Sequence, residues 1–145
     1  MDSLKMKFFT LEEANDILPE IQSVITEINS KKEKLARKLV ETGKLKAKIS
    51  ENGNRQELKE NIAALMSIHQ QLVESYQQLI AKGLVVRDIN TGFVDFPTII
   101  QGDLGYFSWQ PGEETVGKWH PVNDKLLKPI TSDLKMLKLP DNSQN

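Results

Sequence analysis

The sequence predicts an α+β protein in which a long antiparallel helical hairpin is followed by a small antiparallel β-meander. Apolar residues recur at heptad spacing through the first half of the chain, and the polar break Asn52-Gly53-Asn54 divides this stretch in two. After Gly83 the pattern changes to short strand-like runs separated by turn residues. We therefore expect a hairpin over residues 1–82, a β-rich module over residues 83–140 packed on it within one domain, and a disordered tail over residues 141–145.

The first helix is expected to begin at a capping box, in which Thr10 and Glu13 satisfy each other's backbone N–H groups. Pro19 removes one helical hydrogen bond and predicts a kink or restart near Leu18–Glu20. Farther along, the helix is expected to fray through Gly43 and the lysines around it. Its apolar positions alternate between spacings of three and four, which is typical of a coiled-coil seam: Leu18, Ile21, Ile25, Ile28, Lys32, Leu35 and Leu39.

The second helix is expected to end at Lys82-Gly83, because glycine favours the left-handed conformation of a helix C-cap. In an antiparallel pair His69 could face Lys32, forming a polar layer that fixes the register. A lone hairpin buries only one stripe per helix, so we expect a second copy to cover the rest in a four-helix homodimer. The seam of this helix comprises Leu58, Ile62, Leu65, His69, Leu72, Tyr76 and Leu79.

The β-rich module is expected to contain three to five short strands. Turn residues punctuate it at Asn90-Thr91-Gly92, Gly102–Gly105 and Pro111-Gly112. Six of the nine aromatic residues lie between positions 93 and 119, so the aromatic part of the core is expected here. The strand-like runs are 84–89, 93–96, 98–100, 106–109 and 116–122.

The composition excludes several classes of protein. The chain has no cysteine, which rules out disulfides, thiolate metal sites and a cysteine nucleophile. No stretch approaches the about 18–20 apolar residues of a membrane span, and the N-terminus lacks the apolar run of a signal peptide, so a cytoplasmic location is expected. Phosphate-binding glycine loops, nucleophile elbows, paired-histidine zinc helices and calcium loops are also absent. We therefore predict no particular enzyme class and no particular cofactor.

Charge is distributed unevenly, although the net charge is only −1. Eight basic residues stand against two acidic ones over residues 31–48, a local charge of +6. Residues 83–124 carry a local charge of −4. The basic stretch fits either a solvated, lysine-rich helix face or a surface that contacts RNA or another acidic partner.

Three residues of the β-rich module could form a ligand or metal site. Asp95 is flanked by apolar residues and is a poor candidate for a surface position, while Glu113 and His120 could supply a second carboxylate and an imidazole. Together they could bind a divalent ion or act as an acid–base pair, with Trp109 and Trp119 as walls that stack a ligand. The alternative is structural: Asp95 and Glu113 in turns, a hydrogen-bonded His120 and tryptophans in the core. Ser108 has no obvious base beside it.

Several segments together resemble a known family. Phe9–Asn15 with Leu18-Pro19 opens the chain, Gly92–Pro97 reads Gly-Phe-Val-Asp-Phe-Pro, and Trp109, Gly112-Glu113 and Trp119-His120 follow. In this order they resemble the small bacterial and archaeal proteins grouped as domain of unknown function 2203, over roughly Phe9 to Pro129. The resemblance implies this architecture and these recurrent residues, and no established activity.

The sequence departs from that family at two places. Ser108 stands where relatives often have cysteine. The stretch Asn123–Pro129 replaces a Gly-Phe-x-Gly-Arg-like segment, so only Lys125 or Lys128 could substitute for its arginine, without the bidentate fork.

Three functions are therefore open. The first is a non-catalytic, self-associating interaction or scaffold protein, possible partners being a second copy or another protein. The second is a metal- or small-ligand-binding protein, hydrolytic in one version, with its site at Asp95, Glu113 and His120. The third is contact with RNA or an acidic surface through the lysine-rich part of the hairpin.

Overall fold

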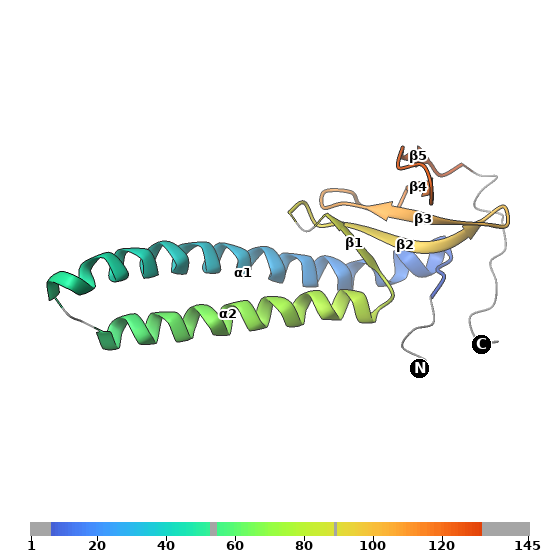
Figure 1. Cartoon of the computed structure of the whole chain (residues 1–145). Coiled ribbons are helices and arrows are strands. Elements are labelled where there is room, and N and C mark those ends of the chain that lie inside the picture. Colours follow the sequence, from blue (N-terminus) through green and yellow to red (C-terminus); the bar gives the residue numbers. More distant parts are fainter. Residues whose placement is uncertain (1–6, 53–54, 89, 132–145) are drawn as a thin grey trace. The chain divides into compact units, whose positions relative to one another are not determined.

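A computed structural model describes residues 7–52, 55–88 and 90–131. Two helices precede five strands, which confirms the α+β class and the element order (Figure 1). The strands form one sheet whose spatial order follows the chain, with every neighbouring pair antiparallel, so the meander is confirmed as well. The elements are α1 (Leu11–Asn52), α2 (Arg55–Ala81), β1 (Val85–Asp88), β2 (Phe93–Ile100), β3 (Asp103–Trp109), β4 (Lys118–Pro121) and β5 (Lys128–Pro129).

The chain divides into two compact units, and both helices pass through each of them. One unit contains the sheet together with the chain up to Ser23 and from Leu79 onward, and the other is Val24–Gln78. The first turns of α1 therefore belong with the sheet. Over its described residues, neither helix is long and apolar enough to cross a membrane. The tail expected at residues 141–145 lies outside the described residues.

The capping box at the start of α1 is confirmed. The Thr10 N–H donates to Glu13 Oε1 at 2.8 Å, and the Glu13 N–H donates to Thr10 Oγ1 at 3.0 Å. The expected restart at Pro19 was wrong, because α1 is continuous from Leu11 to Asn52. Pro19 is exposed, so the proline ring and the helical hydrogen bond that it removes lie away from the core. The expected fraying through Gly43 was also wrong.

The end of α2 is a Schellman motif, which confirms the C-cap expected at Gly83. Gly83 has φ of 93°, its N–H donates to the Ile80 carbonyl at 2.9 Å, and the Leu84 N–H donates to the Leu79 carbonyl at 3.3 Å. Leu79 and Leu84 are both buried, as the apolar contact of this motif requires. This cap turns the chain from α2 into β1.

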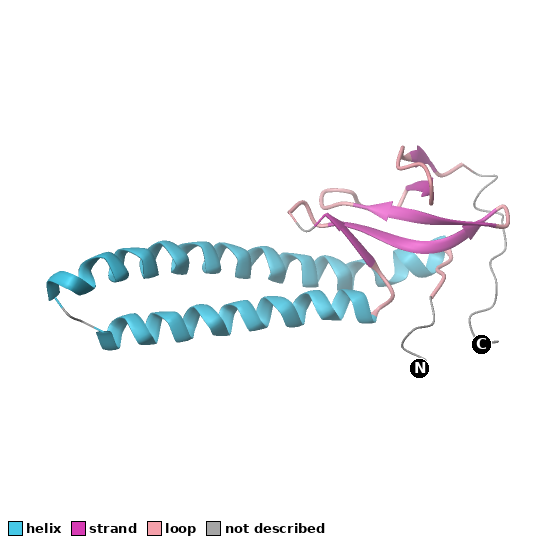
Figure 2. Cartoon of the chain, viewed as in Figure 1, coloured by secondary structure: helices cyan, strands magenta, loops and turns pink. Residues whose placement is uncertain are grey.

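Within Val24–Gln78 the two helices lie side by side and antiparallel, and hydrogen bonds between side chains join them (Figure 2). Lys31 Nζ donates to Ser75 Oγ at 3.2 Å, and Asn61 Nδ2 donates to Thr42 Oγ1. The polar layer expected from Lys32 and His69 is not formed, because His69 is exposed. α2 is instead rotated about its axis so that one edge of its apolar stripe, the edge that carries Asn61 and Ser75, faces α1.

One face of the sheet packs on the segment that leads into α1. The Phe9 ring meets Phe96 edge-on with centroids 5.3 Å apart, and Thr98 Oγ1 donates to the Phe9 carbonyl at 2.7 Å. The Val116 N–H donates to Asn15 Oδ1 at 2.8 Å, which ties the loop before β4 to the first turns of α1. These contacts leave the opposite face of the sheet for the candidate site.

Pro97 does not interrupt β2, so the two runs expected at 93–96 and 98–100 are one strand. The Pro97 carbonyl accepts from the Phe9 N–H at 2.8 Å, on the side of β2 that faces away from β3. The N–H that proline lacks would point to that same side, and β1 pairing has already ended at Asp95. The β2–β3 ladder is therefore intact. The turn expected over Gly102–Gly105 was wrong, because β3 begins at Asp103.

Candidate functional site

The site is organised by the two-residue turn between β2 and β3. Gln101 and Gly102 both have positive φ, 54° and 86°, as a type I′ turn requires. The turn pairs Ile100 with Asp103, and the register that follows from it pairs Asp95 with Ser108. Residues directly opposite each other in an antiparallel pair share a face of the sheet, so these two side chains are neighbours.

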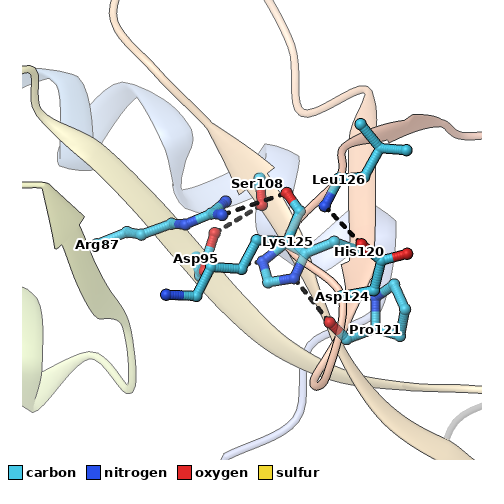
Figure 3. Close-up of polar contacts among 8 residues, drawn as sticks. All are labelled: Arg87, Asp95, Ser108, His120, Pro121, Asp124, Lys125 and Leu126. Carbon is cyan, nitrogen blue, oxygen red and sulfur yellow. Dashed lines mark hydrogen bonds and ion pairs between the residues drawn. The ribbon is translucent and has the colours of Figure 1, made fainter.

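His120 joins this pair from β4. Its pairing with Tyr106 places it one diagonal step from Ser108 on the same face, and its ring stacks on Tyr106 with centroids 5.2 Å apart. His120 Nε2 lies 3.0 Å from Asp95 Oδ2, and the Ser108 hydroxyl donates to Asp95 Oδ1 at 2.6 Å (Figure 3). Three strands thus contribute to one polar cluster, and all three of its side chains are buried.

The hydrogen bonds of His120 restrict where its protons lie. Nδ1 is 2.8 Å from the Pro121 carbonyl oxygen, which can only accept, so Nδ1 carries a hydrogen. The contact between Nε2 and the carboxylate of Asp95 then needs a second proton, on one atom or the other. Both side chains are buried, so this contact is closed to solvent.

Glu113 does not join Asp95 and His120. Its Oε1 accepts from the Gln110 N–H at 2.9 Å, and its Oε2 lies 3.3 Å from Lys118 Nζ. These contacts hold the turn that follows β3. Within the described parts of the chain, no group of three or more His, Asp or Glu side chains is placed to hold a metal ion. The structure thus brings together two of the three residues expected to form the site.

The tryptophans lie on the other face of the sheet. Trp109 follows Ser108 in β3 and pairs with Val94, the residue before Asp95. Trp119 precedes His120 in β4 and pairs with Phe107. Because successive side chains of a strand point to opposite faces, neither ring borders the Asp95 cluster. Trp109 is buried, with its Nε1–H donating to the Glu113 carbonyl at 2.8 Å. Trp119 is half-buried beneath the Lys128 ammonium. Ligand binding by these residues stays a prediction.

Sequence reasoning missed two residues of this region, Ser108 and Arg87. Asp95, which accepts from the Ser108 hydroxyl, is thirteen positions away in the chain. A turn centred on Gln101-Gly102 predicts this pair, because residues at equal distances on either side of a hairpin turn lie opposite each other. Arg87 lies in a bulge of β1, where the register shifts between Val86 and Asp88. No pattern in the sequence indicates where its side chain would point.

The comparisons with known proteins agree with the resemblance. A family model described as "Uncharacterized conserved protein (DUF2203)" matches residues 7–126, which include both helices and the first four strands. No curated protein and no solved structure matches the chain. The matched span covers most of the sequence and contains Asp95, Ser108 and His120. The chain therefore belongs to the DUF2203 family of uncharacterised conserved proteins.

Proposed function

We propose that the protein is a self-associating interaction protein, and that a second copy binds along one edge of the helix pair within Val24–Gln78. The observation that carries this proposal is a set of large apolar side chains left on that edge. Leu39 of α1 is 54% exposed, and Ile62 and Met66 of α2 are 41% and 64% exposed. Their positions along the hairpin and around each helix support a single shared surface.

The three side chains lie at one level of the hairpin. Thr42 contacts Asn61, so in an antiparallel pair residue 39 is level with the turn of α2 between Ile62 and Met66. Leu39 and Ile62 also occupy the same heptad position on their two helices. The positions of α1 that face α2 continue through Leu35 and Thr42, and those of α2 through Asn61 and Leu65, which places Leu39 and Ile62 at e positions. In an antiparallel pair the e positions flank the same side of the interface.

This edge is self-complementary, which favours a second copy as the occupant. A twofold axis brings one patch against an identical patch, so apolar atoms of α1 and α2 meet apolar atoms of α2 and α1. The apolar stripe of each helix is wider than a single neighbour covers, and a four-helix arrangement buries the second edge. We call Leu39, Ile62 and Met66 the hairpin patch.

The double substitution Ile62→Lys with Met66→Lys tests the proposal. Burying each of these side chains contributes about 1.5–3 kcal/mol, and each change acts twice in a symmetric dimer, so the dimer should weaken by at least about 1,000-fold. Sedimentation equilibrium at micromolar concentration should show a dimer for the original chain and a monomer for the variant. The matched control is Gln71→Lys with Gln78→Lys, which adds the same charge to exposed positions on the side of α2 away from the patch. A monomeric original chain, or a control that also dissociates, would contradict the proposal.

We propose nucleic-acid contact as a second candidate function, on the basis of a stripe of basic residues on α1. Lys34, Arg37, Lys44 and Lys48 are exposed and follow spacings of three, seven and four, so they share one side of the helix. Glu41 lies on the same line, and the Lys38 ammonium pairs with it at 3.1 Å. The stripe therefore presents four cations with little internal neutralisation, in the arrangement that a phosphate backbone recognises.

Binding through this stripe should depend steeply on salt. Four phosphate contacts to single-stranded nucleic acid predict a slope of log K against log salt of about −3, and Lys34→Gln with Lys44→Gln should reduce it to about −1.5. Fluorescence anisotropy with a labelled oligonucleotide measures both slopes. The control, Lys59→Gln with Lys128→Gln, removes the same charge outside the stripe and should keep the original slope. Absence of binding at low salt, or equal slopes for the two variants, would rule this function out.

A further inference from the structure

Arg87 has an incomplete set of hydrogen bonds. Its Nη1 is buried and has no partner among the described residues, while its Nη2 donates to the Lys125 carbonyl at a long 3.3 Å. The guanidinium lies over the Phe93 ring, with Cζ 4.9 Å from the ring centroid, a cation–π contact that helps to hold it in place. A buried N–H of a charged group without an acceptor is costly, so this atom requires an explanation.

No carboxylate neutralises this guanidinium within the described parts of the chain. Asp95 is the buried acid of the region, and both of its oxygens are already engaged, Oδ1 by Ser108 and Oδ2 by His120. Asp88, the next residue along β1, accepts from the Asn90 N–H. Figure 3 shows the Arg87 side chain directed toward the Asp95–Ser108 pair, with His120 on the far side of that pair. Among the described residues, this region therefore contains a cationic donor, Arg87 Nη1, that makes no hydrogen bond.

The segment that meets Arg87 is weakly attached at this point. The loop over residues 122–127 contacts Arg87 through the Lys125 carbonyl. Two other hydrogen bonds of this loop are local turns, from the Asp124 N–H to the Pro121 carbonyl at 3.4 Å and from the Leu126 N–H to Asp124 Oδ1 at 3.0 Å. Val122 and Leu126 are both exposed, so they contribute little burial to hold the loop down. Displacing the Lys125 carbonyl from Arg87 therefore costs one long hydrogen bond.

We propose that Arg87 binds an oxyanion, a carboxylate or phosphate group, at this place. Two oxygens of such a group accept from Nη1 and Nη2 together, which satisfies the orphaned N–H and replaces the Lys125 carbonyl with a charged acceptor. Guanidinium groups recognise carboxylate and phosphate in this bidentate manner, and charge-assisted bonds of this kind are stronger than a bond to a neutral carbonyl. The ligand then lies beside the buried contact between Asp95 and His120. The site lies wholly within the sheet-containing unit and is independent of self-association.

The test is a titration of the purified full chain with inorganic phosphate and, separately, with acetate. Each is compared with chloride at equal ionic strength by heteronuclear NMR of the arginine side-chain N–H groups and of the backbone amides. Saturable shifts of the Arg87 side chain and of Lys125 and Leu126 are expected with at least one of the two anions. Whichever anion binds more tightly identifies the source, a phosphate ester or a carboxylate.

Three variants make the assignment specific. Arg87→Gln should abolish the shifts, and Arg87→Lys, which keeps the charge and loses the fork, should weaken binding by about 10-fold or more. Arg55→Gln removes an exposed arginine that belongs to neither proposed binding surface and should leave the affinity unchanged. Amide spectra in chloride show that each variant is folded. Absence of saturable shifts with both anions, or equal affinities for Arg87→Gln and the original chain, overturns the proposal.

Discussion

Replacing Asp95 with alanine is expected to destabilise the protein by about 3–5 kcal/mol, because two buried polar groups lose their partner and each such loss costs about 1–3 kcal/mol. The change leaves the Ser108 hydroxyl and His120 Nε2 without their acceptor in a site closed to water. A loss of this size is a large part of the stability of a typical domain, so the midpoint of urea unfolding should fall sharply. Tryptophan fluorescence reports the transition, because both tryptophans lie in the sheet.

Two further variants separate the network from a general effect of altering the sheet. Asp95→Asn keeps an oxygen that can accept from Ser108 and an amide that can donate to His120, so it should cost clearly less than alanine. Asp103→Ala removes an exposed carboxylate from the same sheet and should change stability by no more than about 0.5 kcal/mol. If the Asp95 and Asp103 alanine variants unfold at the same urea concentration, the cluster contributes nothing to stability.

Replacing Trp109 with alanine is expected to cost about 3–5 kcal/mol as well, but through a cavity rather than a polar network. Trp109 is 2% exposed and is among the largest fully buried side chains of the described residues. The same change removes the donor that the Glu113 carbonyl accepts from at 2.8 Å, so the turn that follows β3 loses one of the contacts that hold it. Chemical unfolding followed by circular dichroism measures the loss without relying on the deleted fluorophore.

Trp109→Phe distinguishes the two contributions. Phenylalanine fills most of the space and lacks the N–H, so the loss should be about 1–2 kcal/mol, and the amides of Gly112 and Glu113 should exchange faster with solvent. Trp119→Phe, at the half-buried tryptophan of β4, should cost less than Trp109→Ala. A Trp109→Ala chain as stable as the original would show that this ring lies outside the core, where a ligand could stack on it.

Local features of the fold could be predicted from the sequence because they depend on residues a few positions apart. The capping box of Thr10 and Glu13, the glycine C-cap at Gly83 and the change of period after it are all of this kind. Pro19 and Gly43 were overestimated as breakers, since each costs a limited amount and a long helix with good formers on both sides compensates for it.

Predicting the edge of each apolar stripe requires more than spacing. From spacing alone, α2 could face α1 through the line Leu58, Ile62, Leu65 and His69 or through a neighbouring line that includes Asn61. Both are open because the apolar face of α2 is wider than one interface. In the structure the edge with Asn61 and Ser75 faces α1, and both polar side chains form hydrogen bonds with residues of α1. Ile62 and His69 were left on the exposed edge, and the hairpin patch follows from that choice.

The sequence by itself determined that this chain makes a helical hairpin and a meander, and it singled out Asp95, Glu113 and His120 as candidate site residues. Only the tertiary structure decided that Asp95 and His120 meet, that Ser108 joins them, and that Glu113 and both tryptophans do not. It also decided that Arg87 Nη1 has no partner among the described residues. The physical reason is the register of the strands. Side chains alternate between faces at every residue, so a shift of one position would exchange the Asp95 cluster for the core, and the turn at Gln101-Gly102 together with packing on Phe9 sets that register.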